Sequence, residues 1–148
     1  YKNRGPMGGT LNSKQMSKAR IFVSATADAS IKNQFIEKLQ VIKGVIRNGE
    51  IETSVHDIKT HPPADLDFES CNVIGSGVRS MCSVWEDPDF SNTEDAYYYV
   101  RVIANKSCRW SYDLCLKNPS YCEDSSESSV PKFIQERAWT SPIWLENS

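Results

Sequence analysis

The chain has 148 residues, of which 39% are hydrophobic and 24% are charged, and its formal net charge is -2. This length is enough for one hydrophobic core, so a single domain is expected. The charge balance leaves no concentrated basic surface for a nucleic acid or an anionic membrane, and no apolar run approaches the roughly 20 residues of a membrane span.

The N-terminal part of the chain divides into an arm and a first strand. Residues 1–19 are rich in glycine, lysine, serine and asparagine, so we expect an extended arm or linker there. Because the chain begins with Tyr1 and not with methionine, we expect a processed or partial product. A strand is predicted over 20–27, where Ile21 and Val23 alternate with residues of the opposite face.

The clearest local signal is Asn48-Gly49, which separates two strand-like runs within 39–58 and favours a type I′ hairpin turn. The turn fixes the register of the two strands. The resulting pairs are Arg47 with Glu50, Ile46 with Ile51, Val45 with Glu52, Ile42 with Val55 and Val41 with His56. One face then carries Ile42, Ile46, Ile51 and Val55, and we expect this face to belong to the core.

The middle of the chain alternates between loops and strands. Residues 60–77 contain Pro62-Pro63, two glycines and several acids, which predicts a loop. A short strand over 81–85 ends at the turn sequence Asp87-Pro88-Asp89. The strongest strand is predicted over 96–104, where aromatic and β-branched residues lie on both faces.

The C-terminal part combines a long excursion with a last strand. Residues 105–132 carry three cysteines and an acidic, serine-rich run, 124–129. The last strand, 137–145, contains Pro142, which predicts an edge position or a bulge because proline cannot donate a ladder hydrogen bond. Six strands without a long amphipathic helix predict an all-β fold, an antiparallel immunoglobulin-like β-sandwich with long cysteine-containing loops over residues 20–148.

The five cysteines are many for a cytosolic domain of this size, and none has the C-x2-C spacing of a zinc site. They favour an oxidising compartment, so a periplasmic or extracellular location is expected. Two pairings each close a loop, Cys71 with Cys82 and Cys115 with Cys122, and the alternative that the cysteines are reduced and buried stays open. The odd count leaves at least one cysteine free or paired outside this segment.

Several stretches carry a resemblance to a known family. They are Gly5-Pro6-Met7-Gly8-Gly9, the Trp-Glu-Asp-Pro-Asp-Phe run at 85–90, Tyr99-Val100-Arg101-Val102, and Trp139-Thr140-Ser141-Pro142-Ile143-Trp144. From about Gly5 to Trp144 the chain resembles the C-terminal segment of the DUF3604 family, which is related to PHP-type metal-dependent phosphoesterases. The resemblance implies a small β-domain that follows a catalytic domain with its own metal-binding residues. A divalent metal would then belong to the parent protein, and no cofactor is expected in this chain.

One cluster of potential metal ligands is present, formed by His56-Asp57, His61 and Asp65-Leu66-Asp67. Strand alternation points His56 and Asp57 to opposite faces, and the other residues lie in a proline-containing loop. Three rigidly held ligands around one ion, as a catalytic zinc requires, are therefore not expected. The sequence indicates neither a cysteine–histidine nucleophile pair nor a phosphate-binding glycine loop, so we predict no catalytic residue and no metal ligand.

Six arginine and tryptophan side chains are interface candidates, because these residue types concentrate where protein surfaces meet. They are Arg101, Arg109, Trp110, Arg137, Trp139 and Trp144. Core packing with an arginine–tryptophan stack is one alternative, and a carbohydrate-binding platform is another. In addition, Asn105-Lys106-Ser107 matches the acceptor pattern for glycosylation at Asn105.

Two hypotheses for the function follow. In the first, the chain is a non-catalytic C-terminal β-sandwich of a DUF3604-like, PHP-related hydrolase, and it supports or borders an active site located upstream. A further option is that this segment supplies a catalytic residue to a composite active site, with Arg101 or Arg109 as the candidate anion ligand. In the second, it is a structural subunit of an extracellular assembly in which the arm adds a strand to another copy of the chain. The expected partner is thus an upstream catalytic domain or the same chain, and fold resemblance alone does not decide between them.

Overall fold

The computed structural model describes residues 4–31, 33–122 and 131–147, and most of this part is β-structure. The strands are β1 (Thr10–Asn12), β2 (Arg20–Thr26), β3 (Ile36–Arg47), β4 (Glu50–Thr60), β5 (Asp65–Leu66), β6 (Val73–Ile74), β7 (Ser80–Glu86), β8 (Ala96–Cys108), β9 (Phe133–Trp139) and β10 (Ile143–Glu146). The helical elements are short, namely η1 (Ser13–Gln15), α1 (Trp110–Lys117) and η2 (Pro119–Cys122). The all-β class is confirmed, whereas the immunoglobulin-like arrangement stays a prediction. In the described ranges no helix is long and apolar enough to cross a membrane.

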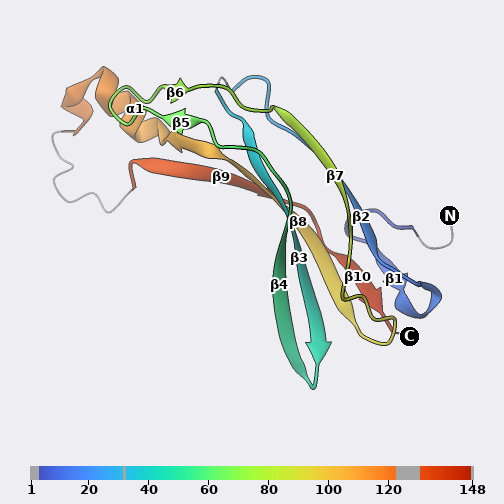
Figure 1. The fold of residues 1–148 in the computed structure, drawn as a ribbon. Helices are drawn as coiled ribbons and strands as arrows, with labels where there is room; N and C mark the ends of the chain where they lie inside the picture. Colours follow the sequence, from blue (N-terminus) through green and yellow to red (C-terminus); the bar gives the residue numbers. More distant parts are fainter. Residues whose placement is uncertain (1–3, 32, 123–130, 148) are drawn as a thin grey trace.

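A six-stranded sheet forms the body of the molecule, in the order β1-β10-β8-β3-β4, with β9 also paired to β8 (Figure 1). The long strand β8 shares one edge between two partners, because β10 pairs with its first residues and β9 with residues 101–108. The single last strand predicted over 137–145 is therefore two strands. The ladder is interrupted around Pro142, where Thr140 substitutes its hydroxyl as the acceptor for the Val100 amide at 3.0 Å.

Part of the expected N-terminal arm lies in this sheet. Strand β1 pairs parallel to β10, and before it the Gly8 amide donates to the Pro142 carbonyl at 2.8 Å. Directly after β1, the fully buried Ser13 donates its hydroxyl to the carbonyls of Asn92 and Glu146, at 3.1 and 3.2 Å. Residues 8–13 therefore belong to the packed domain.

The β3–β4 hairpin has the predicted register, with Arg47 opposite Glu50 and Ile42 opposite Val55. Its turn is made by Asn48 and Gly49, whose φ angles of 53° and 81° are the positive values that a type I′ turn requires. A bulge shifts the register once, near the start of β3.

Strands β2 and β7 form a separate antiparallel pair, which we call the β2–β7 ribbon, and it packs on one face of the large sheet (Figure 1). The core lies between the two layers. Its buried members are Ala19, Ile21, Val23, Ile36, Leu39, Val41, Met81, Tyr98, Val100 and Leu145. A third, very short pair, β5 with β6, lies near α1 (Figure 1).

The predicted core face of the hairpin is wrong except at Ile42. Ile42 is buried, but Ile46, Ile51 and Val55 expose 51%, 65% and 51% of their surface. The reason is that the β2–β7 ribbon covers the opposite face, where Leu39 and its alternate neighbours point. We call the face away from the ribbon the outer face; besides these aliphatic residues it carries Tyr97, Tyr99, Trp139 and Trp144.

The predicted pairing of Cys71 with Cys82 is also wrong, because Cys71 forms a disulfide with Cys108 across a Cα–Cα distance of 5.7 Å. Cys82 is a free, exposed thiol within the β2–β7 ladder, whereas Cys71 stays beside the end of β8. Cys115, in α1, is disulfide-bonded. The side chain of its predicted partner, Cys122, lies outside the described residues.

Candidate functional site

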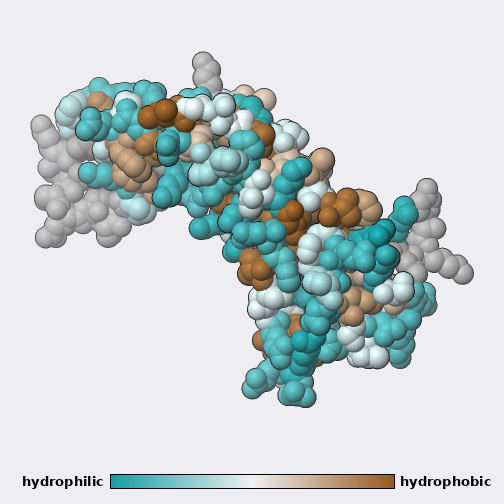
Figure 2. Space-filling model, viewed as in Figure 1, coloured by the Kyte–Doolittle hydropathy of each residue, from teal (hydrophilic) through white to brown (hydrophobic). Residues whose placement is uncertain are grey.

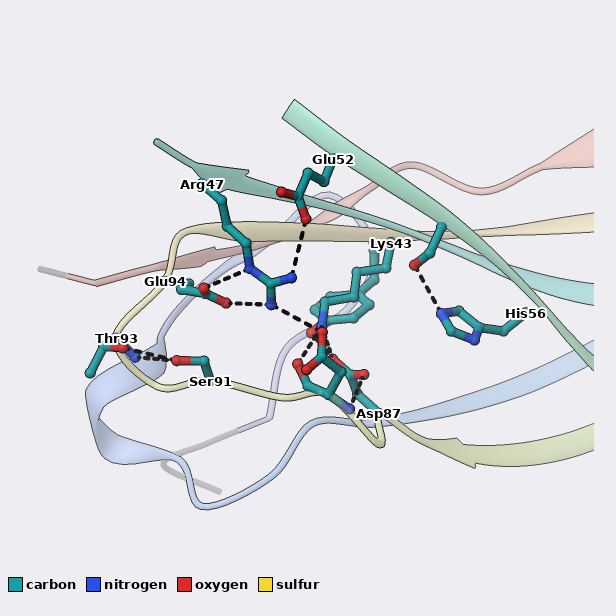
Figure 3. Close-up of polar contacts among 11 residues, drawn as sticks. Lys43, Arg47, Glu52, His56, Asp87, Ser91, Thr93 and Glu94 are labelled. Carbon is teal, nitrogen blue, oxygen red and sulfur yellow. Dashed lines mark hydrogen bonds and ion pairs between the residues drawn. The ribbon is translucent and has the colours of Figure 1, made fainter. Parts of the chain in front are cut away.

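A buried ion pair joins β3 to the connection between β7 and β8 (Figure 3). The Lys43 ammonium lies 2.7 Å from the Asp87 carboxylate, and both side chains are almost completely buried. The Tyr98 hydroxyl donates to the same carboxylate at 2.6 Å, while Lys43 also donates to the Asp89 carbonyl at 2.6 Å. Burial, together with the hydrogen bond to Asp87, holds the pKa of Tyr98 well above its ordinary value. Each charge in this network thus has a partner, as burial requires.

A second, more exposed cluster surrounds Arg47 at the end of β3 (Figure 3). Its guanidinium donates to Glu94 at 2.8 Å, to Asp89 at 3.0 Å and to Glu52 at 3.2 Å. Hydrogen bonds from Arg47 hold the pKa of Glu94 and that of Asp89 below their ordinary values. Together with the buried pair, the cluster ties residues 87–94 to β3 and so fixes where β8 begins.

The start of β8 presents an aromatic row on the outer face. The rings of Tyr97 and Tyr99 stack with centroids 6.3 Å apart, and the Tyr97 ring lies 5.5 Å from that of Trp144 on β10. Tyr97 also covers Gly44 so closely that a Cβ atom there would collide with its ring. Glycine in β3 is therefore what lets this aromatic row lie flat on the sheet.

A shallow groove of about 340 Å³ follows the aromatic row. Its lining residues are Tyr97, Tyr99, Trp139, Thr140, Pro142 and Trp144. Trp139 and Trp144 expose 59% and 45% of their surface, so neither tryptophan is a core residue. The interruption at Pro142 separates the two tryptophans along the edge of β8 and leaves the groove between them.

A chain of polar contacts lies beside the groove and reaches Arg101 on β8. The Arg101 Nε donates to Gln40 Oε1 at 2.7 Å, and the Gln40 amide donates to Asp57 on β4. Lys38 pairs with the same carboxylate at 2.9 Å. Hydrogen bonds from Gln40 and then Lys38 lower the pKa of Asp57 from its ordinary value, so it carries its charge at neutral pH.

Comparison of the sequence with known protein families identifies the family of the chain. Residues 1–147 match the family model described as "Protein of unknown function (DUF3604)". The chain belongs to the DUF3604 family. No curated protein and no solved structure gives a significant match.

The interface residues predicted for this DUF3604 chain divide into two groups. Arg101, Arg137, Trp139 and Trp144 come together around the outer face, on β8, β9 and β10. The other two, Arg109 and Trp110, lie at the start of α1, beside a cleft of about 780 Å³ near the Cys71–Cys108 disulfide. Arg137 also lines this cleft. In Figure 2, hydrophobic side chains reach the surface both at the α1 end and near the middle of the molecule.

The glycosylation candidate Asn105 is buried, with 2% of its surface exposed. Its Oδ1 accepts from the Phe35 amide at 2.8 Å, and its Nδ2 donates to the carbonyls of Asn33 and Lys106. A glycan on this nitrogen would break the contacts that hold the end of β8 to the start of β3, so the folded domain does not present Asn105 as an acceptor.

The histidines and acids weighed as metal ligands do not converge. The centroid of the His56 ring lies 4.9 Å from that of Trp85, and His56 forms a hydrogen bond with the Ser54 hydroxyl. His61 forms a hydrogen bond with the Pro62 carbonyl at 2.8 Å. Among the described residues, no group of three or more histidine, cysteine or acidic side chains is placed to hold a metal ion.

Sequence reasoning missed Lys43, Asp87 and Gln40. Asp87 was assigned only to a turn, where an aspartate is expected to bond its own backbone, so its burial gave no signal in the sequence. Lys43 and Gln40 interrupt the apolar run from Leu39 to Ile46 within β3, and both are buried, so each needs a buried hydrogen-bond partner.

Proposed function

We propose that this chain is a non-catalytic C-terminal β-domain of a PHP-related, hydrolase-like DUF3604 protein, and that it supports or borders an active site formed by upstream residues. The observation that carries the proposal is the outer face. It exposes aromatic and aliphatic side chains from five strands of one sheet, including Ile46, Ile51, Val55, Trp139 and Trp144.

An exposed apolar face of this kind favours contact with a protein partner over contact with water. Monomeric proteins rarely expose a contiguous apolar patch of more than a few hundred Å², and larger patches mark interaction sites. Tryptophan and tyrosine are the residues that dominate binding energy at interfaces. The exposed aliphatic residues of β3 and β4 lie next to the aromatic row and add a second apolar surface, which favours a folded domain as the partner.

The remaining parts of the proposal concern architecture and environment. The two packed layers agree with an immunoglobulin-like sandwich in which the ribbon is the smaller sheet. The Cys71–Cys108 disulfide agrees with a periplasmic or extracellular location. The divalent metal of a PHP-type site would be held upstream, and this domain would contribute a supporting surface and no cofactor.

The test is docking to the upstream part of a longer DUF3604 polypeptide, measured by calorimetry with the 148-residue chain. We expect the double variant Trp139→Ser, Trp144→Ser to weaken this docking by about 100-fold or more, since central aromatic residues carry most of an interface. Phe22→Ser is the matched control, because Phe22 is 74% exposed on β2, away from the outer face. Equal affinities of the two variants, or no docking at all, would contradict the proposal.

The alternative is a structural subunit that assembles by strand addition through residues 1–19. In the structure β1 is already paired with β10 of its own chain, so an exchange would first have to break this pairing. Sedimentation of the intact chain over a range of concentrations separates the two functions. Oligomers that persist in the Trp139→Ser, Trp144→Ser variant would favour strand addition.

A further inference from the structure

We infer that Arg101 is a pre-positioned binding site for an oxyanion, a phosphate or a carboxylate, at the polar end of the outer face. This inference does not depend on the proposed function, because it concerns contacts within the described chain and is tested on that chain alone.

The first support is the way in which Arg101 is held. Its Nε donates to Gln40 Oε1 at 2.7 Å, and Gln40 is itself 7% exposed and fixed by its bond to Asp57. Among the described residues, no hydrogen bond or ion pair uses the two terminal amino groups of Arg101. A guanidinium anchored through Nε keeps these groups side by side for two parallel bonds to one ligand.

The second support is the local charge. Asp57 is the acid of this polar chain, and Lys38 neutralises it at 2.9 Å. Lys38 and Arg101 both interact with Asp57, so together they carry one positive charge more than this acid. Arg137 lies on the same face of β9, two residues from the partner of Arg101 in the ladder. A planar or tetrahedral oxyanion is the ligand that complements this arrangement.

The third support is the neighbouring aromatic surface. Trp139 is the direct cross-strand partner of Arg101, and Tyr99 precedes Arg101 on the same face of β8. Trp139 is 59% exposed, so its indole offers an apolar surface at the register position opposite Arg101. An oxyanion carried on an aromatic ring would thus contact both, which makes aryl phosphates and aryl carboxylates the appropriate probes.

The experiment titrates the 148-residue chain with phenyl phosphate and, separately, with benzoate at constant ionic strength. NMR follows the Arg101 Nε–Hε and Trp139 indole resonances. We expect saturable shifts at both groups. Arg101→Lys should weaken binding by about fivefold or more, because lysine keeps the charge but cannot form two parallel bonds. Arg137→Lys is the matched control and should leave the affinity within about twofold, since no anchored guanidinium is lost there.

A positioning variant separates anchoring from charge. Gln40→Met keeps the charge of Arg101 but removes the acceptor of its Nε, and we expect weaker binding together with faster solvent exchange of the Nε proton. If Gln40→Met does not fold, Asp57→Ala, at a partly exposed position, removes the acceptor that fixes Gln40. Its readout is the solvent exchange of the Arg101 Nε proton, which we expect to be faster. Saturable binding of either probe at Arg101 supports the inference, and the tighter probe identifies which oxyanion the site prefers. Shifts that do not saturate, or an Arg101→Lys variant that binds like the wild type, would overturn the inference.

Discussion

At the scale of residues, the buried ion pair between Lys43 and Asp87 is expected to contribute more to stability than the exposed ion pairs do. Asp87→Ala would leave the Lys43 ammonium buried without its carboxylate and Tyr98 without its acceptor. Because removal of one partner leaves an uncompensated charge, we expect the free energy of unfolding to fall by about 3–5 kcal/mol in urea titrations. Asp89→Ala is the control, because the Asp89 side chain is 72% exposed, so the free energy of unfolding should fall much less in this variant. Similar losses in both variants would mean that the buried pair has no special role.

Acid sensitivity is expected to arise from the carboxylates around Arg47. The pKa values of Glu94 and Asp89 are lowered in the folded chain by hydrogen bonds from Arg47, whereas the unfolded chain has ordinary values near 4. Their contribution to stability is therefore present above about pH 4–5 and is lost as the pH falls through the lower, folded values.

Urea unfolding between pH 7 and pH 3 tests this expectation. The free energy of unfolding should change little down to about pH 5 and then fall. Arg47→Gln should be less stable at neutral pH but should lose less on acidification, while Arg137→Gln, which removes an exposed arginine elsewhere, should follow the wild type. An unchanged pH dependence in Arg47→Gln would assign the acid sensitivity to other carboxylates, such as Glu86 with Arg20.

At the scale of elements, the Cys71–Cys108 disulfide links the segment after β5 to the end of β8. The bond closes a loop of sequence separation 37, so we expect the double variant Cys71→Ser, Cys108→Ser to lose about 3–4 kcal/mol on the chain-entropy description. Guanidinium unfolding measures the loss. Cys82→Ser should be close to the wild type, because Cys82 is a free, exposed thiol. A loss in the Cys82 variant equal to that of the double variant would contradict the pairing.

The elements show how far sequence reasoning reaches. The hairpin register could be predicted because Asn48-Gly49 imposes it locally, and the interruption near Pro142 follows from its missing amide. The buried face of the hairpin could not, because both faces carry apolar residues and only the position of the β2–β7 ribbon decides which is covered. The cysteine pairing likewise depends on which distant segments meet, and not on spacing along the chain.

The residue types of the candidate site could be predicted from the sequence, but the contacts between these residues could not. Arg101, Trp139 and Trp144 were expected at an interface and do lie together on the outer face, because β9 and β10 share one edge of β8. Gln40, which anchors Arg101, comes from β3 and gave no functional signal in the sequence. A contact across strands 61 residues apart is a property of the tertiary fold.

At the scale of the whole molecule, the two layers differ in size. The large sheet has six strands and the ribbon two, and the ribbon covers a single face. The described part of the chain places no layer on the outer face, which leaves Ile51 and Val55 of β4 largely exposed. Because this face leaves aliphatic and aromatic side chains uncovered, we expect a partner there.

The asymmetry predicts that substitutions on the outer face cost much less stability than substitutions on the face that the ribbon covers. Ile51→Thr together with Val55→Thr should change the free energy of unfolding by no more than about 0.5 kcal/mol, as for surface positions generally. Leu39→Ala, at a fully buried position on the ribbon side of β3, should cost about 2–5 kcal/mol. Urea unfolding at two protein concentrations measures both effects. A loss in the double threonine variant as large as that of Leu39→Ala, and dependent on concentration, would show that the isolated chain covers its outer face with a second copy and does not hold it open for another domain.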